Sequence, residues 1–313
     1  MTERLYYAEQ GLVEFAAEVA DIREFSNEGG KKTWQIALDR SAFYPVSGGQ
    51  PFDLGEMEAV APSGTKLTVP VLRVDEDESG EVWHSVEKPL LPGTAITGRV
   101  DAARRRDHMQ QHTGQHLLSA IFLREIGAAT VGFHLGEASS TIDLDCAALS
   151  AEDVKRIEIA VNAAVLEDRV VRPSFVSREK AEAMLARGEL RKLPERDGEI
   201  RLIEIEGVEW NACGGTHVGR TGEIGAVLLR KTEKIKRGIR VEFVCGMRAV
   251  RRSRAEFDEL DGVARALSVG ALGVGGRVAK LLEDAKAAGK EQKRLAKELA
   301  GLSSGAQAAK LEG

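Results

Sequence analysis

The segments HTGQH (residues 112–116) and CGGTH (residues 213–217) each hold two potential metal ligands four residues apart. Imidazole and thiolate are the ligands that zinc prefers, and on a helix a spacing of four places two side chains on one face. The chain has only six His and three Cys, and four of these side chains fall in the two segments. The sequence therefore predicts that the segments meet in one tetrahedral zinc site.

The predicted metal ligands are His112, His116, Cys213 and His217. Either pair taken alone is a weak signal, because two His at this spacing can simply be satisfied side chains on one helix face. An unmetallated pair in the core or at the surface is therefore the alternative to zinc.

Length and composition describe a soluble protein with a sizeable core. The 313 residues are 43% hydrophobic and 30% charged, which favours two or three domains. No run approaches the ~20 apolar residues that a membrane span needs, and the start MTERLYYAEQ has no apolar signal-peptide core. Cys146, Cys213 and Cys245 are too few for a disulfide framework. We therefore expect a cytoplasmic protein with no membrane partner.

Charge is distributed unevenly along the chain. Residues 1–98 hold 8 Lys and Arg against 17 Asp and Glu, whereas the rest of the chain holds 36 against 32. Residues 230–254 concentrate the positive charge. Such a run is usually a solvated face, but it also suits a polyanionic partner, whose phosphates attract Lys and Arg.

The N-terminal part, residues 1–98, is predicted to be a small antiparallel β-barrel. Short runs rich in β-branched and aromatic residues are separated by turn residues. The expected strands are residues 12–25, 33–38, 66–74, 81–86 and 95–100. The glycine-rich segment FYPVSGGQPFDLG (residues 43–55) could let the backbone approach a ligand, but a tight turn is the favoured interpretation. A nucleotide-phosphate loop is not expected, because the segment lacks a strand-to-helix setting.

Residues 101–126 are predicted to form one helix of about seven turns. The segment lacks Pro, starts at an acidic residue and stops at Gly127. His108, His112 and His116 fall on one stripe of this helix. We expect His108 to be a donor to a ligand or a surface residue rather than a ligand itself.

The middle of the chain, residues 99–250, is predicted to be an α+β metal-binding domain. Residues 139–145 alternate as a half-buried strand, and a helix over 150–168 starts with the cap pair Ser150 and Asp153. Further strands over 170–176, 199–205, 223–229 and 239–244 are expected to complete one mixed sheet. Gly214 and Gly215 are expected to supply positive φ values that turn Cys213 and His217 toward one point.

Residues 251–313 are predicted to be helical, with helices over 249–267 and 277–303 around a break at 268–276. Mostly apolar positions in the second helix, with the polar Gln292 among them, recur at steps of three and four, as in a coiled coil or a helical hairpin. These positions are Val278, Leu281, Ala285, Ala288, Gln292, Leu295, Leu299 and Leu302. Because the sequence stops soon after this helix without a clear tail or cap, we expect a helix of another chain, in a homodimer, or a segment beyond a truncation to complete the seam.

The motifs HTGQHLLSAIF and WNACGGTHVGRTGEIGAVLLRKTEKIKRGIRVEFVCG resemble the editing domain of alanyl-tRNA synthetase and the freestanding alanyl-tRNA editing proteins. The segment FYPVSGGQPFDLG is similar to the glycine-rich part of the barrel that precedes this domain. The resemblance covers residues 1 to about 250 in one consistent order. Because the sequence opens on the barrel, a freestanding hydrolase is implied, of the longer subclass with a helical C-terminal region.

The resemblance implies a zinc-dependent hydrolase that acts in translation fidelity. It would cleave the ester between serine or glycine and the 3′ end of alanine tRNA, with His112, His116, Cys213 and His217 as zinc ligands. Zinc would activate water or orient the substrate carbonyl. Since four protein ligands describe a closed site, either one ligand, most plausibly His217, is loose or displaced, or zinc expands its coordination, or zinc only shapes the pocket. His217 is accordingly a predicted catalytic residue. Gly114 stands where alanine is common, a change that costs about 1 kcal/mol of helix propensity.

Glu137 lies near a glutamine of the synthetase version and is a predicted catalytic residue. A general base, a partner of the substrate amine and a simple ion pair all stay open for it. Selection of serine over alanine is expected to need a hydroxyl group in the pocket. The candidates for this substrate-binding role are Thr130, Thr113 and Thr141, with Thr130 preferred.

Candidate tRNA contacts are Arg104, Arg105, Arg106, Lys234, Lys236 and Arg237. Two other functions stay open at this stage. One is a hydrolase that edits threonyl-tRNA, whose domain shares the metal pattern. The other is a noncatalytic, zinc-containing tRNA-binding protein in which the metal is structural.

Overall fold

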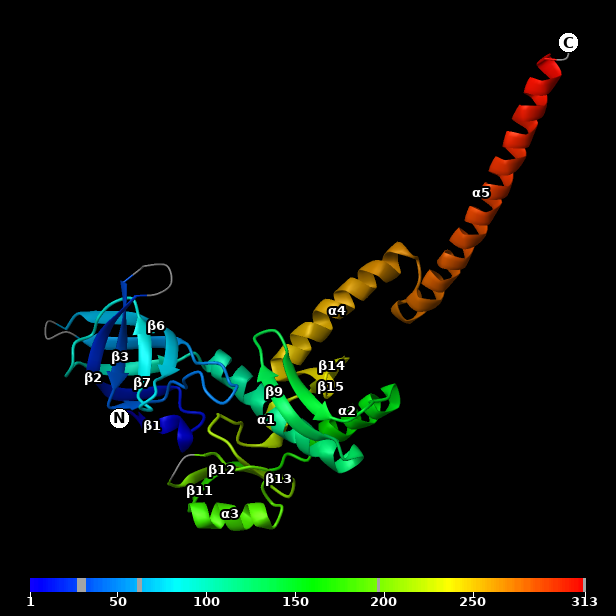
Figure 1. Cartoon of the computed structure of the whole chain (residues 1–313). Coiled ribbons are helices and arrows are strands. Elements are labelled where there is room, and N and C mark those ends of the chain that lie inside the picture. Colours follow the sequence, from blue (N-terminus) through cyan, green and yellow to red (C-terminus); the bar gives the residue numbers. More distant parts are fainter. Residues whose placement is uncertain (27–31, 61–63, 196–197, 312–313) are drawn as a thin grey trace. The chain divides into compact units, whose positions relative to one another are not determined.

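The computed structural model describes residues 1–26, 32–60, 64–195 and 198–311, with side chains described as far as residue 301. The chain divides into two compact units, Met1–Val250 and Arg251–Gly313, which are considered separately (Figure 1). The fold mixes α and β structure, as predicted. In the described part of the chain, every helix is too short or too polar to cross a membrane.

Six antiparallel strands of the first unit close into a barrel, in the order β2-β3-β7-β6-β5-β8. Their bounds are β2 Glu14–Ser26, β3 Lys32–Leu38, β5 Gly55–Val60, β6 Lys66–Glu76, β7 Val82–Val86 and β8 Ala95–Val100. Ile36, Met57 and Val69 lie in its fully buried core. The predicted small barrel is therefore confirmed, with β5 as a strand that the sequence analysis missed. Beside it lie β1 Glu3–Arg4, the short 3-10 helix η1 Leu5–Tyr7 and β4 Arg40–Ser41.

Helix α1, Ala102–Ile126, forms as predicted. The side chain of Asp101 accepts hydrogen bonds from the backbone N–H groups of Ala103 and Arg104, and Gly127 ends the helix in the left-handed conformation at φ 68°. Every residue from His108 to Ser119 is buried, because α1 is covered on several sides by β9, α2 and β15. This helix passes through the middle of the first unit (Figure 1).

Two separate antiparallel sheets replace the single mixed sheet that was predicted. The larger contains β9 Ala129–Leu135, β10 Ser140–Asp145, β14 Val227–Ile235 and β15 Gly238–Cys245 in the order β14-β15-β10-β9. The smaller contains β11 Val171–Val176, β12 Ile200–Ile205 and β13 Glu209–Ala212. The prediction failed because β12, buried along its whole length, pairs on both edges within this small sheet.

The helices around these sheets follow local capping signals. Helix α2, Ala151–Leu166, begins with the predicted reciprocal bonds between Ser150 and Asp153. Helix α3, Arg178–Ala186, was not predicted, although Ser177 caps it. The strand expected over 223–229 begins only at Val227, because residues Thr221–Ile224 form the short 3-10 helix η2.

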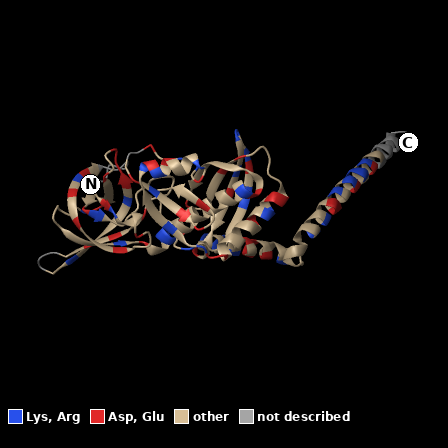
Figure 2. Cartoon of the chain, turned by 90° about the horizontal axis from the view of Figure 1, so that it is seen from below, with Lys and Arg blue, Asp and Glu red and all other residues tan. Residues whose placement is uncertain are grey.

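Helix α4, Gly246–Ala266, leads from the first unit into the second, which continues with η3 Ala271–Gly273 and α5 Val274–Leu311. Basic and acidic side chains are interspersed along α5 (Figure 2). Of the predicted seam, Val278, Leu281, Leu295 and Leu299 are exposed. The side chain of Leu302 lies outside the described part. The division of the first unit at residue 98 and the partner for the seam both stay predictions.

Candidate metal centre

The two His/Cys segments meet in the first unit. His112 and His116 project from one face of α1, Cys213 follows the end of β13, and His217 lies in the loop after it. Their ligand atoms all lie within 4.8 Å of one another. The Cys213 Sγ is 3.5 Å from His112 Nε2 and 3.4 Å from His217 Nε2. Within the described residues, this is the only group of three or more His, Cys, Asp or Glu side chains that could hold a metal ion.

The tautomer of His112 is set by Gln50, from the glycine-rich segment of the barrel. Gln50 Oε1 accepts a hydrogen bond from the backbone N–H of Thr216 at 3.0 Å, and its Nε2 donates to Thr216 Oγ1 at 2.9 Å. These bonds fix which end of the amide is the acceptor. His112 Nδ1 lies 2.8 Å from this oxygen and must donate to it. The lone pair of His112 therefore sits on Nε2, which faces Cys213.

Thr113 sets the tautomer of His217 by the same logic. Its hydroxyl donates to the carbonyl oxygen of Met109 at 2.8 Å and accepts from the N–H of Val218 at 3.1 Å. The single hydroxyl proton is thereby used, so the contact of 3.2 Å with His217 Nδ1 requires the ring nitrogen to donate. The Nε2 atom of His217 is left as an acceptor toward Cys213.

His116 has a carboxylate on its outer side. Its Nδ1 is 3.5 Å from Glu209 Oε1, and Asn211 Nδ2 lies 3.2 Å away. Burial alone would lower the pKa of His116, but the bonds with Cys213 and Glu209 raise it to about 9. Glu209 is in turn paired with Arg191. A carboxylate behind a histidine in this way is a recurrent arrangement for metal ligands.

The fourth side chain of the cluster, Cys213, is disposed to be a thiolate. Burial would raise the pKa of its thiol, but its histidine neighbours, including a hydrogen bond with His116, hold this pKa well below its usual range. Burial also lowers the pKa of His217 well below its usual value, which favours the neutral ring. Two imidazoles with their lone pairs turned inward, a third beside a carboxylate and one thiolate form a donor set that fits a tetrahedral zinc ion.

The CGGTH loop is shaped by close approach rather than by the predicted positive φ values. Neither Gly214 nor Gly215 has a positive φ. A side chain at Gly215 would instead overlap the ring of His112, so only glycine lets the loop come this near to α1. Gly114 has a similar explanation, because a methyl group there would overlap the sulfur of Cys245.

Two buried polar side chains support this loop, and the sequence analysis missed both. Arg201 of β12 donates to the carbonyl oxygens of Cys213 at 2.6 Å and of Gly215 at 3.0 Å. Gln10 Oε1 accepts from the N–H of His217 at 2.7 Å and from Arg201 at 3.1 Å. Gln50 is a third buried polar side chain that supports the loop. The glycine-rich segment 43–55 therefore does more than form the tight turn that was the favoured interpretation, because its Gln50 contacts the CGGTH loop.

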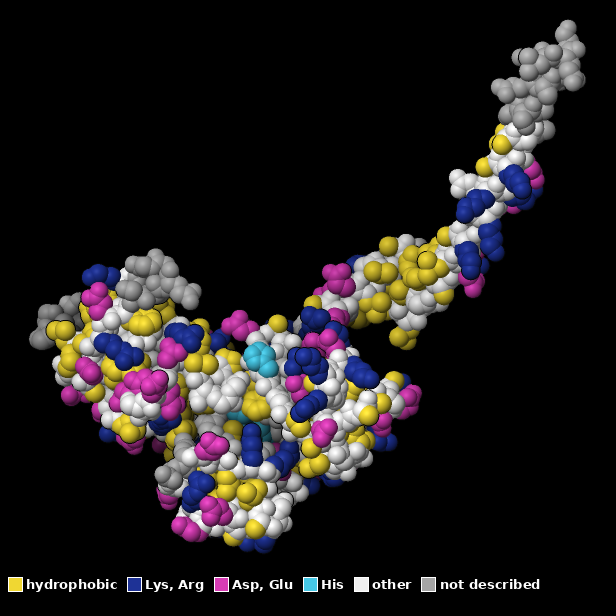
Figure 3. All heavy atoms as spheres, in the orientation of Figure 1, with side chains coloured by type: hydrophobic (Ala, Val, Ile, Leu, Met, Phe, Trp, Pro, Cys, Tyr) yellow, Lys and Arg dark blue, Asp and Glu magenta, His cyan; other side chains and the backbone are white. Residues whose placement is uncertain are grey.

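A cavity of about 380 Å³ opens beside the cluster. Figure 3 shows this face of the first unit. The residues that line it include His112, Gln115, His116, Thr130, Arg191 and Cys213. His217 is not among the residues that line it, and its ring and backbone are both held by hydrogen bonds. These bonds do not support the looseness predicted for His217, and its predicted part in catalysis stays a prediction.

Of the three predicted substrate-binding threonines, only Thr130 lines the cavity. Its hydroxyl donates to Ser119 Oγ at 2.7 Å, and Gln115 Nε2 reaches the same oxygen at 2.9 Å. Thr113 is fully buried and already uses its hydroxyl for His217. Thr141 lies in β10, opposite His134 and Glu242, outside the lining. The predictions for Thr113 and Thr141 are thus corrected.

Glu137 does not reach the cavity. Its side chain is 84% exposed and lies 3.9 Å from Arg104, so a surface ion pair is the alternative that the structure contains. The predicted catalytic role does not fit this position. His108 is buried rather than exposed, and its Nδ1 has no hydrogen-bond partner within the described part of the chain.

The predicted tRNA contacts divide into buried and exposed residues. Arg105 is 1% exposed and donates to Asp53 Oδ2 at 3.0 Å and to the carbonyl oxygen of Gln10 at 2.8 Å. It cannot reach a phosphate, and its prediction is corrected. Arg104 donates to the carbonyl oxygen of Phe52, while Arg106 pairs with Glu223 at the surface. Lys234, Lys236 and Arg237 are exposed on the β14–β15 hairpin.

Comparison with known proteins supports the family resemblance that the motifs indicated. A family model described as the threonyl and alanyl tRNA synthetase second additional domain matches residues 200–241. The alanine–tRNA ligase of Halorubrum lacusprofundi is 36% identical over 317 residues, covering 99% of this chain and 33% of the ligase. The ligase of Pyrococcus furiosus is 34% identical, covering 96% of this chain and 32% of the ligase. This chain thus spans about a third of the length of these ligases.

A much shorter relative matches nearly end to end. The alanyl-tRNA editing protein AlaX-M of Methanosarcina mazei is 36% identical over 238 residues, which cover 74% of this chain and 92% of the relative. Similarity of this extent over almost a whole protein shows that this chain belongs to the alanyl-tRNA editing protein family.

Proposed function

We propose that this chain removes serine or glycine from mischarged alanine tRNA by zinc-dependent hydrolysis of the aminoacyl ester. The observation that carries the proposal is the position of the His/Cys cluster on the wall of an open cavity. The cavity volume of about 380 Å³ is that of a small-ligand site. The printed name of the Methanosarcina relative, an alanyl-tRNA editing protein, supports the same substrate class.

Zinc bound by His112, His116, Cys213 and His217 would supply a Lewis acid that polarises an ester carbonyl and lowers the pKa of nearby water. The protein's own part is to hold the four donor atoms in place. Gln50 and Thr113 fix the tautomers of two rings, and Glu209 backs the third. Such support matters because ligand orientation typically changes metal affinity or activity by about 10–100-fold.

The substrate approaches from the side of three ligands. His112, His116 and Cys213 line the cavity, whereas His217 lies behind them. An aminoacyl ester in the cavity would therefore meet the cluster on the face that His217 does not cover. With all four side chains bound, zinc would have to expand its coordination to polarise an ester carbonyl that approaches from this side.

Thr130 is the proposed determinant for serine. Its hydroxyl proton is directed to Ser119, which leaves its oxygen able to accept a hydrogen bond from the hydroxyl of a seryl group. Alanine has no hydroxyl to offer and would leave this polar group unpaired in a desolvated pocket. We expect Thr130→Val to reduce the preference for seryl over alanyl ester, while equal selectivity in the variant would refute this role.

The body of the tRNA is proposed to lie against the β14–β15 hairpin. Lys234, Lys236 and Arg237 are exposed there. Each phosphate contact that they make should contribute to the salt dependence of binding. We also propose that the exposed seam of α5 supports a homodimer.

The direct test is deacylation of seryl-tRNA and glycyl-tRNA for alanine by the wild type and by Cys213→Ala, with zinc content measured in both. The proposal expects one zinc per wild-type chain, hydrolysis by the wild type, and loss of both in the variant. Correctly charged alanyl-tRNA is the control for selectivity.

Two outcomes would replace the proposal. Hydrolysis of seryl-tRNA for threonine in preference to the alanine substrates would make the chain a threonyl-type editing hydrolase. A gel shift with tRNA but no hydrolysis, in protein fully loaded with zinc, would make it a noncatalytic tRNA-binding protein.

A further inference from the structure

Packing and backbone conformation leave the identity of Gly214 unexplained. Its φ is not positive, and a Cβ atom built there would lie 3.7 Å from its nearest contact outside the neighbouring residues, the hydroxyl oxygen of Tyr7. The next residue differs, because a Cβ atom at Gly215 would overlap the ring of His112. Gly214 also lines the cavity beside the cluster. Since the fold itself accepts a side chain at this position, the glycine instead keeps the backbone at the cavity wall uncovered.

The uncovered group is the backbone N–H of Gly214, which has no hydrogen-bond partner in the described part of the chain. The N–H groups on either side of it are bonded, that of Cys213 to the carbonyl oxygen of Arg201 at 3.3 Å and that of Gly215 to Cys213 Sγ at 3.4 Å. The next N–H groups of the loop, at residues 216–218, are bonded as well. Backbone N–H groups that are removed from solvent nearly always find a partner, so this one is a donor for a ligand that fills the cavity.

Arg201 fixes the direction of this N–H. It is 1% exposed, and its guanidinium donates to the carbonyl oxygen of Cys213 at 2.6 Å. That carbonyl and the N–H of Gly214 belong to one peptide unit, which is trans, so the N–H points opposite to the carbonyl and away from Arg201. Cys213 and Gly214 line the cavity, whereas Arg201 does not. The N–H therefore projects to the cavity side, and the cation at the carbonyl end strengthens it as a donor.

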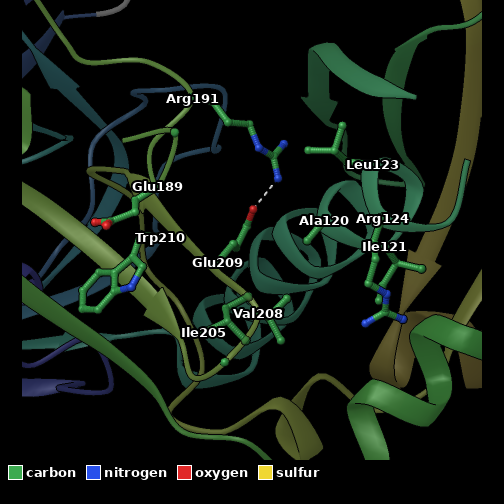
Figure 4. A pocket seen from close by; sticks show the side chains of 12 residues that line it. Ala120, Ile121, Leu123, Arg124, Glu189, Arg191, Ile205, Val208, Glu209 and Trp210 are labelled. Carbon is green, nitrogen blue, oxygen red and sulfur yellow. Dashed lines mark hydrogen bonds and ion pairs between the residues drawn. The ribbon is translucent and has the colours of Figure 1, made fainter. Parts of the chain in front are cut away.

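Most side-chain donors in the cavity lining are already engaged. Arg191 pairs with Glu209, as Figure 4 shows in a close view of the neighbouring cavity that Arg191 also lines. Asn211 Nδ2 donates to the same carboxylate at 2.9 Å. The glutamine amide of α1 and the threonine hydroxyl of β9 that line the cavity donate within the protein too. Lys192, which is exposed in the lining, is the rival donor that a test must separate from Gly214.

We propose that the N–H of Gly214 is a catalytic group that donates a hydrogen bond to the ester carbonyl oxygen, on which negative charge develops during hydrolysis. The inference rests on the proposed function and deepens its mechanism. The oxygen of a water molecule adds to the carbonyl carbon, and the π electron pair moves onto the carbonyl oxygen. As the carbonyl re-forms, the bond to the ribose oxygen breaks. The ribose oxygen takes a proton that the water supplied, which yields the free amino acid and the tRNA hydroxyl.

A backbone donor suits this site for two reasons. The four side chains of the cluster complete a tetrahedral donor set, so a donor on the protein stabilises the carbonyl oxygen without a further position at the ion. The N–H is also held in place before the substrate arrives, and donors of this kind typically contribute about 100–1000-fold to kcat. Arg201 acts through this peptide unit and is therefore a positioning residue.

Amide NMR of the wild-type, full chain tests the contact without hydrolysis. Cysteine labelled at its carbonyl carbon and glycine labelled at nitrogen select the Cys–Gly peptide bonds, which this sequence has at 213–214 and 245–246. The signal of Gly246 is the internal control, because its N–H donates to the carbonyl oxygen of Ala226 at 2.9 Å and it lies outside the cavity lining.

The probes are two stable analogues of adenosine with serine esterified at the 3′ position. One has a planar amide in place of the ester, and the other has a charged, tetrahedral phosphonate in place of the carbonyl group. We expect the phosphonate to move the Gly214 amide proton downfield, the amide analogue to move it much less, and neither to move that of Gly246. An unmoved Gly214 proton at saturating phosphonate would overturn the proposal.

The kinetic test replaces the N–H of Gly214 by an oxygen, in the backbone variant Gly214→glycolic acid. We expect kcat for seryl-tRNA and glycyl-tRNA to fall about 100-fold or more, and phosphonate affinity to fall about tenfold or more. Affinity for the amide analogue and zinc per chain should stay unchanged. Gly219→glycolic acid is the matched control, because it removes the N–H of an exposed glycine outside the lining, which also has no partner among the described residues.

The outcomes separate the donor from its rival and from the proposed function. A fall in kcat with Lys192→Gln but not with Gly214→glycolic acid would overturn the assignment to Gly214. A phosphonate-dependent shift of Gly214, in a chain that hydrolyses no mischarged tRNA, would refute the proposed function while supporting a donor for a tetrahedral anion. Hydrolysis of seryl-tRNA with a Gly214 proton that ignores the phosphonate would remove the donor and leave the proposed function standing.

Discussion

The metal cluster and helix α5 place their functional side chains in opposite environments. At the cluster, His112, His116 and His217 are each at most 5% exposed, and each outer ring nitrogen has a polar neighbour. Along α5, Leu295 and Leu299 are 46% and 64% exposed. A substitution at the cluster must therefore disturb several hydrogen-bonded neighbours at once. A substitution of an exposed α5 side chain affects only contacts with other molecules.

Removal of a metal ligand should have the largest effect. We expect Cys213→Ala to lose zinc and to lower deacylation by roughly a hundredfold or more, since the remaining histidines cannot supply the thiolate. Zinc per chain, measured by atomic emission, and the rate of seryl-tRNA hydrolysis check this. Cys146→Ala, which changes a cysteine outside the cluster, is the control. Full activity in a zinc-free Cys213→Ala protein would contradict the role of the metal.

The buried pair of Arg105 and Asp53 should come next, because it joins α1 to the barrel. Arg105→Ala leaves a buried carboxylate without its partner, which typically costs about 3–5 kcal/mol. Denaturant unfolding measures this loss. Arg106→Ala, one residue away but exposed, should change the free energy of unfolding by less than about 0.5 kcal/mol. If Arg105→Ala instead kept full stability and weakened tRNA binding, the original prediction of a phosphate contact would be restored.

Gln50 tests whether the barrel contributes to the cluster. Gln50→Ala removes the acceptor for His112 Nδ1 and should reduce zinc affinity about 10–100-fold. Gln50→Glu keeps an oxygen at this position and should recover part of the affinity. Competition with a chromophoric chelator gives the values. Gln35→Ala, another buried glutamine of the barrel, is the control for general loss of stability. Equal zinc affinity in Gln50→Ala and Gln35→Ala would refute the contribution of the barrel.

The residues tested by these variants also show which features could be predicted from the sequence. The grouping of His112, His116, Cys213 and His217 was predictable because each pair is local, with a spacing that a helix or a short loop brings together. Helix α1 was predictable for the same reason, since Asp101 and Gly127 are signals within one segment. Gln50 and Gln10 were not, because their hydrogen bonds reach across 62 and 207 residues of chain. No periodic pattern in the sequence indicates which loop of the barrel faces α1.

Wrong predictions arose where one residue type serves two purposes. Gly215 was interpreted as a source of positive φ, but its requirement is the space occupied by the ring of His112. Arg105 belongs to a run of three arginines that looks like a phosphate-binding patch. Its position on α1 turns it inward to Asp53, while Arg106 stays at the surface. Only the packing around α1 distinguishes these neighbours.

The smallest effect is expected on α5, where the double variant Leu295→Ser and Leu299→Ser removes the exposed apolar side chains. Since both leucines belong to the second unit and are exposed, unfolding of the barrel and cluster should change by less than about 0.5 kcal/mol. The proposed homodimer adds a condition, because covered leucines would make the variant dissociate at concentrations where the wild type stays associated. Sedimentation velocity over a range of concentrations separates the cases. Identical sedimentation of variant and wild type at every concentration would remove α5 as a dimer contact. Dissociation of the variant at concentrations where the wild type stays associated would show that the exposed seam is a dimer contact.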